Sequence, residues 1–233
     1  RAMEDIVAHK GVLIMPVFAT ERTQEILYVI NEMLVQKRIP DVKVFVDSPL
    51  AIQSTKIFGR YSDSYRPEIQ ELYKKHPHLF QFKLLKFTES VGESKAINDI
   101  PPPKVILAGS GMMSGGRILH HAKRYLGDPK SIILFVGYQA SGSLGRRILD
   151  GAKEVKIHGE LVPVKAEARM VDGFSAHADQ EQLISFVEEA RDSLERVFVI
   201  HGEPDAAFNL MNMIQDRFGV PAEVPSYGEK VEL

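Results

Sequence analysis

Short apolar runs alternate with longer amphipathic stretches over the first 150 residues of the chain. Runs rich in Val, Ile and Leu predict buried strands at residues 12–17, 42–47, 105–108 and 132–136. Stretches with one apolar face predict helices, namely one that ends near residue 10 and others over residues 21–37, 48–58, 66–75, 116–126 and 143–149. Residues 79–99 carry no clear pattern. Strands that alternate with helices are typical of a parallel sheet with helical crossovers, so the pattern predicts an α/β fold.

Residues at the expected helix starts support these boundaries. Thr20 is expected to cap the first long helix, and Ser48 followed by Pro49 is typical of a cap and a first helical turn. Later in the chain, Asp179 and Gln182 form a capping-box pattern, which predicts that a helix begins there.

Two further strands are predicted in the last third of the chain, and each leads to a histidine. Residues 162–171 alternate in the manner of one strand, and the loop that follows contains His177. Residues 197–200 form a short apolar run, and His201 follows directly, before Pro204 starts a helix. The carboxyl ends of strands collect ligands and catalytic groups in open α/β sheets, so both imidazoles are candidates for chemistry. The alternative for either histidine alone is an ordinary polar residue at a strand end.

A glycine-rich loop, residues 109–116, connects a predicted strand to the next helix. Its backbone N–H groups are candidates for holding a phosphate at the positive end of that helix. Two other interpretations stay open: a tight strand-to-helix turn, or a loose dinucleotide-binding fingerprint without a convincing acidic partner about 20 residues on. A second Gly/Ser-rich loop precedes Arg146 and Arg147, a pair that is typical of a solvated helix face.

Composition excludes several classes of protein. Hydrophobic residues make up 44% of the chain and charged residues 26%, which is ordinary for a globular domain. The sequence contains no Cys, so a disulfide framework and a thiolate metal site are both excluded. A net charge of −2 excludes a globally basic binder, so any RNA contact must be local. No apolar run approaches the ~20 residues of a membrane span and no signal-peptide pattern is seen, so we expect a cytoplasmic protein.

Five segments together resemble motifs of a known family. Residues 173–180 (Gly-Phe-Ser-Ala-His-Ala-Asp-Gln) and 199–203 (Val-Ile-His-Gly-Glu) resemble motifs B and C of the β-CASP family of metallo-β-lactamase nucleases. Residues 16–25, 46–51 and 108–116 resemble further stretches of the same family. The resemblance runs in order over nearly the whole chain.

The resemblance implies a fold and a function. Residues 1–170 would form the Rossmann-like, parallel-sheet β-CASP domain, and residues 171–233 the returning carboxyl-terminal segment of a metallo-β-lactamase αββα fold. The intact enzyme would hydrolyse RNA phosphodiester bonds with two zinc ions held in the cleft between the two domains. Its partner would be single-stranded RNA. The sequence leaves open whether cleavage is internal or from a 5′ end, and whether the protein forms a homodimer.

The resemblance also assigns roles to individual residues. His201 would be a zinc ligand, and His177 would contact the scissile phosphate and assist the leaving group. The remaining contacts with RNA would come from Ser110, Gly111, Ser175, Ala176 and Arg22.

One part of the family's metal site has no counterpart in the sequence, because no His-x-His-x-Asp-His occurs. The His-x-His at residues 76–78 lacks the Asp-His and has the pattern of a surface turn. His120 and His121 are helical neighbours that point about 100° apart, and His9 and His158 have no evident partner. We therefore expect the carboxyl-terminal part of a longer enzyme, inactive by itself.

Two other functions compete with this interpretation. A non-catalytic RNA-binding scaffold is one, although the presence of both His177 and His201 speaks against it. A Rossmann-type nucleotide-binding enzyme is the other, and its support in the sequence is the glycine-rich loop alone.

Overall fold

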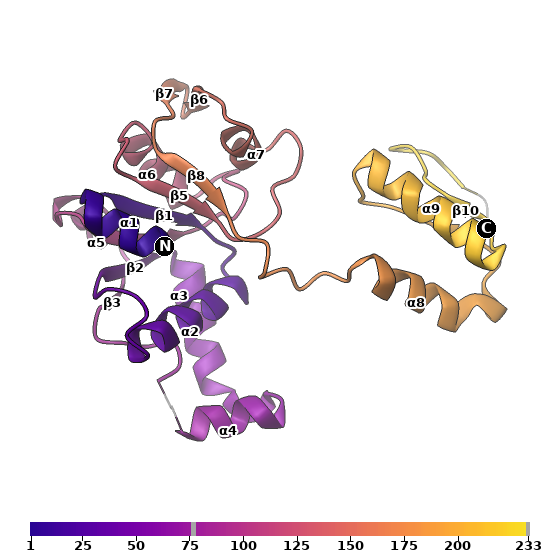
Figure 1. Ribbon diagram of the computed structural model, residues 1–233, viewed down its shortest axis with the longest axis horizontal. Coiled ribbons are helices and arrows are strands. Elements are labelled where there is room, and N and C mark those ends of the chain that lie inside the picture. Colours follow the sequence, from indigo (N-terminus) through magenta and orange to yellow (C-terminus); the bar gives the residue numbers. More distant parts are fainter. Residues whose placement is uncertain (76–77, 232–233) are drawn as a thin grey trace. The chain divides into compact units, whose positions relative to one another are not determined.

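The computed structural model describes residues 1–75 and 78–231. The chain divides into two compact units, Arg1–Ser175 and Ala176–Leu233 (Figure 1).

The first unit is built on a six-stranded sheet with the order β3-β2-β4-β1-β5-β8. Every neighbouring pair in this sheet is parallel. The strands are β1 (Val12–Pro16), β2 (Lys43–Asp47), β3 (Leu85–Phe87), β4 (Lys104–Ala108), β5 (Ile132–Phe135) and β8 (Glu167–Met170). The α/β fold expected from the sequence is thus confirmed.

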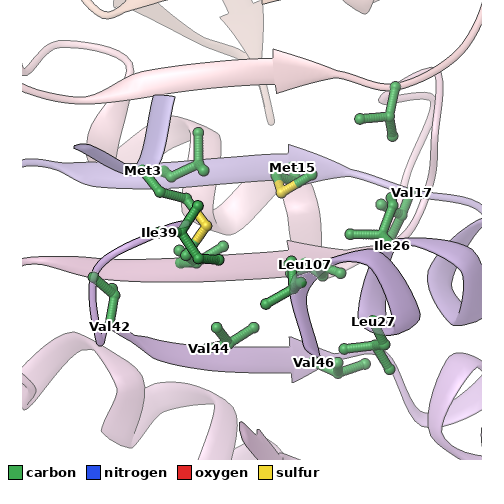
Figure 2. Packing of buried hydrophobic residues seen from close by; sticks show 14 of the residues in the cluster. Met3, Met15, Val17, Ile26, Leu27, Ile39, Val42, Val44, Val46 and Leu107 are labelled. Carbon is green, nitrogen blue, oxygen red and sulfur yellow. The ribbon is translucent and has the colours of Figure 1, made fainter. Parts of the chain in front are cut away.

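Helices cover both faces of this sheet. Successive side chains of each strand point to opposite sides, and since the central strands are chiefly apolar, both faces must be buried. Leu13 and Met15 of β1 join a cluster with α1 (Ala2–His9), α2 (Arg22–Val35) and α3 (Pro49–Arg60). Figure 2 shows this cluster, with Met15 and Leu107 on the same side of their strands. On the other face, Val12 and Ile14 of β1 pack with α6 (Arg117–Tyr125) and α7 (Leu144–Leu149). A further helix, α4 (Pro67–Lys75), packs beside the short 3-10 turn Ser62–Ser64.

The strand order creates a crevice at the carboxyl edge of the sheet. The strands β1 and β2 lead into α2 and α3 on the first face, whereas β4, which lies between them, leads into α6 on the second face. Loops that leave neighbouring strands toward opposite faces open a crevice, and ligands of open α/β sheets bind there. In the dinucleotide-binding order, by contrast, the glycine fingerprint follows the first strand. Here the glycine-rich loop follows β4, which argues against a dinucleotide site.

The prediction of a single strand over residues 162–171 is wrong. The segment is split between β7 (Glu160–Pro163), which pairs antiparallel with β6 (Glu154–Ile157), and β8 in the large sheet. Pro163 has no N–H to continue a ladder. The amides of Lys165 and Ala166 both donate to the Leu126 carbonyl, at 2.7 and 2.9 Å, and this redirects the chain.

The β6–β7 hairpin was not anticipated from the sequence. Its two-residue turn consists of His158 and Gly159, both with positive φ (50° and 84°), as tight hairpin turns require.

Helix starts agree with the sequence in part. Ser48 caps α3, because its side chain accepts a hydrogen bond from the Ala51 amide. Thr20 does not cap α2: the cap position is Glu21, with φ 64° and no side-chain cap bond. The Thr23 hydroxyl instead donates to the Phe18 carbonyl at 2.6 Å and holds the entry to the helix.

The unclear region 79–99 contains β3 and a short helix, α5 (Val91–Ala96). Ser90 and Glu93 form a capping box at the start of α5, a signal that was readable in the sequence.

The second unit is small. It contains α8 (Gln180–Ala190), β9 (Val197–Phe198), α9 (Pro204–Phe218) and β10 (Ala222–Glu223), with β9 and β10 paired in parallel. The capping box of Asp179 and Gln182 is confirmed. The strand predicted over 197–200 is too long, because pairing covers only its first two residues. None of the helices in the described part of the chain combines the length and apolar character needed to span a bilayer.

Candidate functional site

A cavity of about 510 Å³ lies in the first unit, at the carboxyl edge of the sheet. Its walls come from the loops that follow three neighbouring strands, namely Val17, Phe18 and Ala19 after β1, Asp47, Ser48, Pro49 and Leu50 at the end of β2, and Gly109, Ser110, Gly116 and Arg117 after β4. These are the strands between which the connections diverge to opposite faces. The cavity therefore occupies the crevice that the strand order predicts.

A larger cavity, of about 790 Å³, lies between α1, α2 and the β5–β8 side of the sheet. Its walls are chiefly aliphatic. Three of its four charged lining residues are paired with one another, because Arg169 bonds both Asp5 and Glu167 at 2.6 Å. We regard the carboxyl-edge cavity as the better candidate site, because it lies in the crevice where ligands of open α/β sheets bind.

A buried carboxylate anchors the carboxyl-edge cavity. Asp47 is 0% exposed and accepts four side-chain hydrogen bonds. The donors are the Thr88 hydroxyl at 2.8 Å, the Ser94 hydroxyl at 2.6 Å, Arg117 Nη1 at 2.8 Å and His121 Nε2 at 2.7 Å. The network therefore ties the end of β2 to α5 and α6.

The same contacts set the ionisation of Asp47. Burial alone would raise its pKa, but the hydrogen bonds from His121, Ser94, Thr88 and Arg117 outweigh burial and hold the pKa at about 2. Since Asp47 is ionised at neutral pH, His121 Nε2 carries the hydrogen in this pair. Arg117 also donates to the carbonyls of Thr88 and Glu89, at 2.9 and 3.0 Å. Its charge is thus largely committed to structure.

Sequence reasoning missed this network. Asp47 does end an otherwise apolar strand, which is an unusual place for a carboxylate, but its partners lie 41 to 74 residues away in the chain. No local pattern connects them.

The glycine-rich loop uses much of its own backbone. The amide of Ser110 donates to the Gly115 carbonyl at 3.2 Å. Ser110 in turn accepts two amides, that of Met113 on its carbonyl at 3.1 Å and that of Ser114 on its hydroxyl at 3.0 Å. The amide of Ile118 donates to the Gly109 carbonyl at 3.1 Å. A phosphate would compete with these bonds, so the geometry favours the tight strand-to-helix turn over a ready-made phosphate cradle.

Two glycines of this loop are required by close contacts. Gly116 has φ 80°, and a Cβ there would lie 2.3 Å from the Gly109 carbonyl oxygen. A Cβ on Gly111 would come within 2.7–3.0 Å of three atoms of the Phe18 ring. Ser110 lines the cavity, and Gly111 lies against the ring that forms its wall.

Arg22 lies in the first turn of α2. Its Nη1 bonds the Glu25 carboxylate at 2.5 Å, and its guanidinium lies 5.6 Å above the centre of the Phe174 ring. The side chain is only 14% exposed. Arg22 therefore holds the chain just before Ser175, and part of its charge is neutralised.

The predicted site residues are divided between the two units. Ser110, Gly111, Arg22 and Ser175 belong to the first unit, whereas Ala176, His177 and His201 belong to the second. His177 lies in the exposed loop before α8. His201 lies between β9 and α9, is exposed, and has φ 63°. The strands that precede the two histidines, β8 and β9, belong to different sheets.

Among the described residues, no group of three or more His, Cys, Asp or Glu side chains is arranged to hold a metal ion. Zinc sites take three or four protein ligands. These residues by themselves therefore do not fit a zinc ion.

The other histidines have structural contacts. His121 is buried on Asp47, and its helical neighbour His120 stacks on His158 with 4.8 Å between ring centres. The stack gives His158 a structural contact that the sequence did not reveal. Residues 76–77 of the His-x-His segment lie outside the described residues.

Comparisons with known proteins match both units. A family model described as the Beta-Casp domain matches residues 23–148. A second, described as the Zn-dependent metallo-hydrolase RNA specificity domain, matches residues 161–225, which include both His177 and His201.

Curated relatives align along nearly the whole chain. Ribonuclease TTHA0252 of Thermus thermophilus is 36% identical over 231 residues, which are 99% of this chain and 52% of that protein. Transcription termination factor FttA of Methanosarcina mazei is 32% identical over 237 residues, 99% of this chain and 37% of that protein. FttA of Cenarchaeum symbiosum is 33% identical over 239 residues, 100% of this chain and 37% of that protein. The chain thus spans between about a third and a half of these relatives.

Proposed function

Because the chain belongs to the β-CASP family, we propose that it forms the RNA-contacting part of a zinc-dependent ribonuclease. The observation that carries the proposal is the second family match. It is named for RNA specificity and for zinc-dependent hydrolysis, and it contains both histidines singled out in the sequence. The relatives named as a ribonuclease and as transcription termination factors, which align in order with this chain, support it further.

The proposal divides the chain at about residue 170. Residues 1–170 would be the β-CASP domain, and residues 171–233 would belong to a metallo-β-lactamase domain of αββα type. The second unit supports this, because its described residues form a sheet of two strands, which is too small to be stable alone. It also leaves Phe186 72% exposed, together with Ile200 and Phe208, an apolar surface that a larger packed domain would cover.

His177 would protonate the oxygen that leaves when the phosphodiester breaks. Its imidazole is exposed in the loop before α8, and an imidazole is the side chain that most often serves as a general acid. Ser110, Gly111, Arg22 and the Ser175–Ala176 segment would contact the RNA chain without reading its base sequence.

His201 would bind zinc through its imidazole. The other ligands of the proposed two-zinc site would come from parts of the full-length protein outside this chain, because the described residues do not make a zinc site by themselves. Bound zinc would activate a water molecule and neutralise charge on the phosphate.

The test uses two single variants of the full-length protein. His177→Ala is expected to lower ribonuclease turnover by roughly 10²–10⁴-fold while zinc content stays unchanged, as for loss of a general acid. His201→Ala is expected to lower both zinc content and turnover. His120→Ala, an exposed histidine stacked on His158, serves as the matched control and should alter neither.

Loss of zinc in His177→Ala would show that His177 is a ligand and that its role is misassigned. A wild-type protein that binds RNA but does not cut it, with or without added zinc, would support a non-catalytic scaffold instead.

A further inference from the structure

The carboxyl-edge cavity has an aromatic wall that is open to solvent. Phe18 follows β1 and is 46% exposed. One side of its ring packs against Gly111, where a Cβ would collide with three ring atoms, and its carbonyl accepts the Thr23 hydroxyl at 2.6 Å. The ring is therefore packed on one side, and the residue still presents exposed surface to a ligand.

The rest of the cavity suits a largely apolar ligand. Leu50, which is 66% exposed, stands at its mouth with Pro49, and Val17 and Ala19 line it further. Ser48 adds a hydroxyl that accepts the Ala51 amide and so keeps its own hydrogen for a ligand.

Charge at the cavity does not suit a free nucleotide. Arg117 is the only cationic side chain among the residues that line it, and Asp47, 2.8 Å away, neutralises its charge. A nucleotide phosphate would find no uncommitted cation on these walls. A base within an RNA chain needs no cation in this cavity, because the phosphates of that chain can be bound elsewhere.

We propose that this cavity binds one nucleobase of single-stranded RNA, stacked on Phe18. The inference rests on the proposed function, since it assumes that RNA runs over this edge of the first unit. Aromatic rings bind any base by its flat face, so the site would contribute affinity with little sequence preference.

The test measures binding of a short single-stranded RNA that carries 2-aminopurine, whose fluorescence is quenched when the base stacks. Phe18→Ala is expected to weaken binding by about 5- to 100-fold and to abolish the protein-induced quenching, as for loss of one base–aromatic stack. Phe18→Tyr keeps the ring and should keep both. Tyr61→Ala, an exposed aromatic of the same unit that lies outside the cavity, is the matched control and should change neither.

A second variant leaves the packed side of Phe18 untouched. Leu50→Glu places a carboxylate at the mouth of the cavity and should weaken binding and quenching in a protein whose circular dichroism is unchanged. The salt dependence of binding should have the same slope in Phe18→Ala as in the wild type, because a base contact releases no counterions.

The outcomes separate the two proposals. If the wild type binds no RNA, the proposed function fails and the base site falls with it. If the wild type binds RNA and both Phe18→Ala and Leu50→Glu bind and quench equally well, the base site alone is overturned. Tight binding of a free nucleoside triphosphate that Phe18→Ala abolishes would also overturn it, in favour of a nucleotide site.

Discussion

Asp47 stands at the end of an apolar strand, where an unpaired carboxylate would be costly to bury. Its four donors remove that cost and make it the link between β2, α5 and α6. The exposed histidines His177 and His201 are the opposite case, because no described contact restricts them to a structural role. At the scale of single residues, burial and hydrogen-bond partners thus distinguish side chains that stabilise the fold from side chains that are available for a reaction.

Asp47→Asn should destabilise the first unit by about 3–5 kcal/mol, the range for removing one partner of a buried ion pair. The folded-state pKa of about 2 lies below the ordinary value of 3.8, so the carboxylate's contribution is complete above pH 3.8 and is lost as pH falls toward 2. The difference between wild type and variant should therefore shrink over that interval. Urea unfolding at a series of pH values from about 2 to 7 measures it.

Asp192→Asn is the matched control for this prediction, since the Asp192 side chain is 94% exposed, and it should be nearly neutral at every pH. A wild-type advantage over Asp47→Asn that stays constant down to pH 2 would contradict the assigned ionisation.

At the scale of elements, the loops after β1, β2 and β4 decide where a ligand can bind. The glycine-rich loop contributes by its compactness, since Gly116 lets α6 begin directly over the end of β4. That placement puts Arg117 and His121, one turn apart on α6, within reach of Asp47.

Gly116→Ala should destabilise the first unit by about 1–3 kcal/mol, because alanine is strained at φ 80° and its Cβ would meet the Gly109 carbonyl at 2.3 Å. Gly115→Ala is the control one residue earlier: nothing lies within 4 Å of its Cβ, and its φ is not in the positive region. Thermal unfolding should show a drop of about 2–4 °C per kcal/mol for the first variant and little change for the second. Equal effects would mean that the loop is not held in this conformation.

At the scale of the whole molecule, the candidate groups are distributed over two units, with the base site in the first and both histidines in the second. The family matches follow the same order along the chain, residues 23–148 and then 161–225. A function that needs groups from both units depends on how the two units are assembled.

The 233-residue chain, purified alone, should contain zinc well below one ion per molecule, because zinc sites need three or four protein ligands and the described residues contain no such group around the proposed ligand His201. Elemental analysis after dialysis against metal-free buffer measures this. The same analysis of His201→Ala gives the background. Stoichiometric zinc in the wild type that disappears in His201→Ala would show that the chain forms a complete site by itself.

The sequence by itself determined the class of fold and most of its elements. Apolar runs at 12–17, 42–47, 105–108 and 132–136 were confirmed as strands, because a strand buried on both faces must be apolar throughout. Motifs around His177 and His201 identified the family, which the matches confirmed. Their roles as acid and zinc ligand stay predictions. Helix caps such as Ser48 and Asp179 were readable because their hydrogen bonds span three residues.

Only the tertiary structure decided the rest. Contacts between distant segments put β4 between β2 and β1 and so open the crevice. They also place Phe18 on the wall of the cavity, where it is exposed. The four donors to Asp47 come from 41 to 74 residues away, and a hydrogen bond over that separation leaves no periodicity in the sequence. The split of residues 162–171 into two strands has the same origin, because a single carbonyl, that of Leu126, turns the chain there.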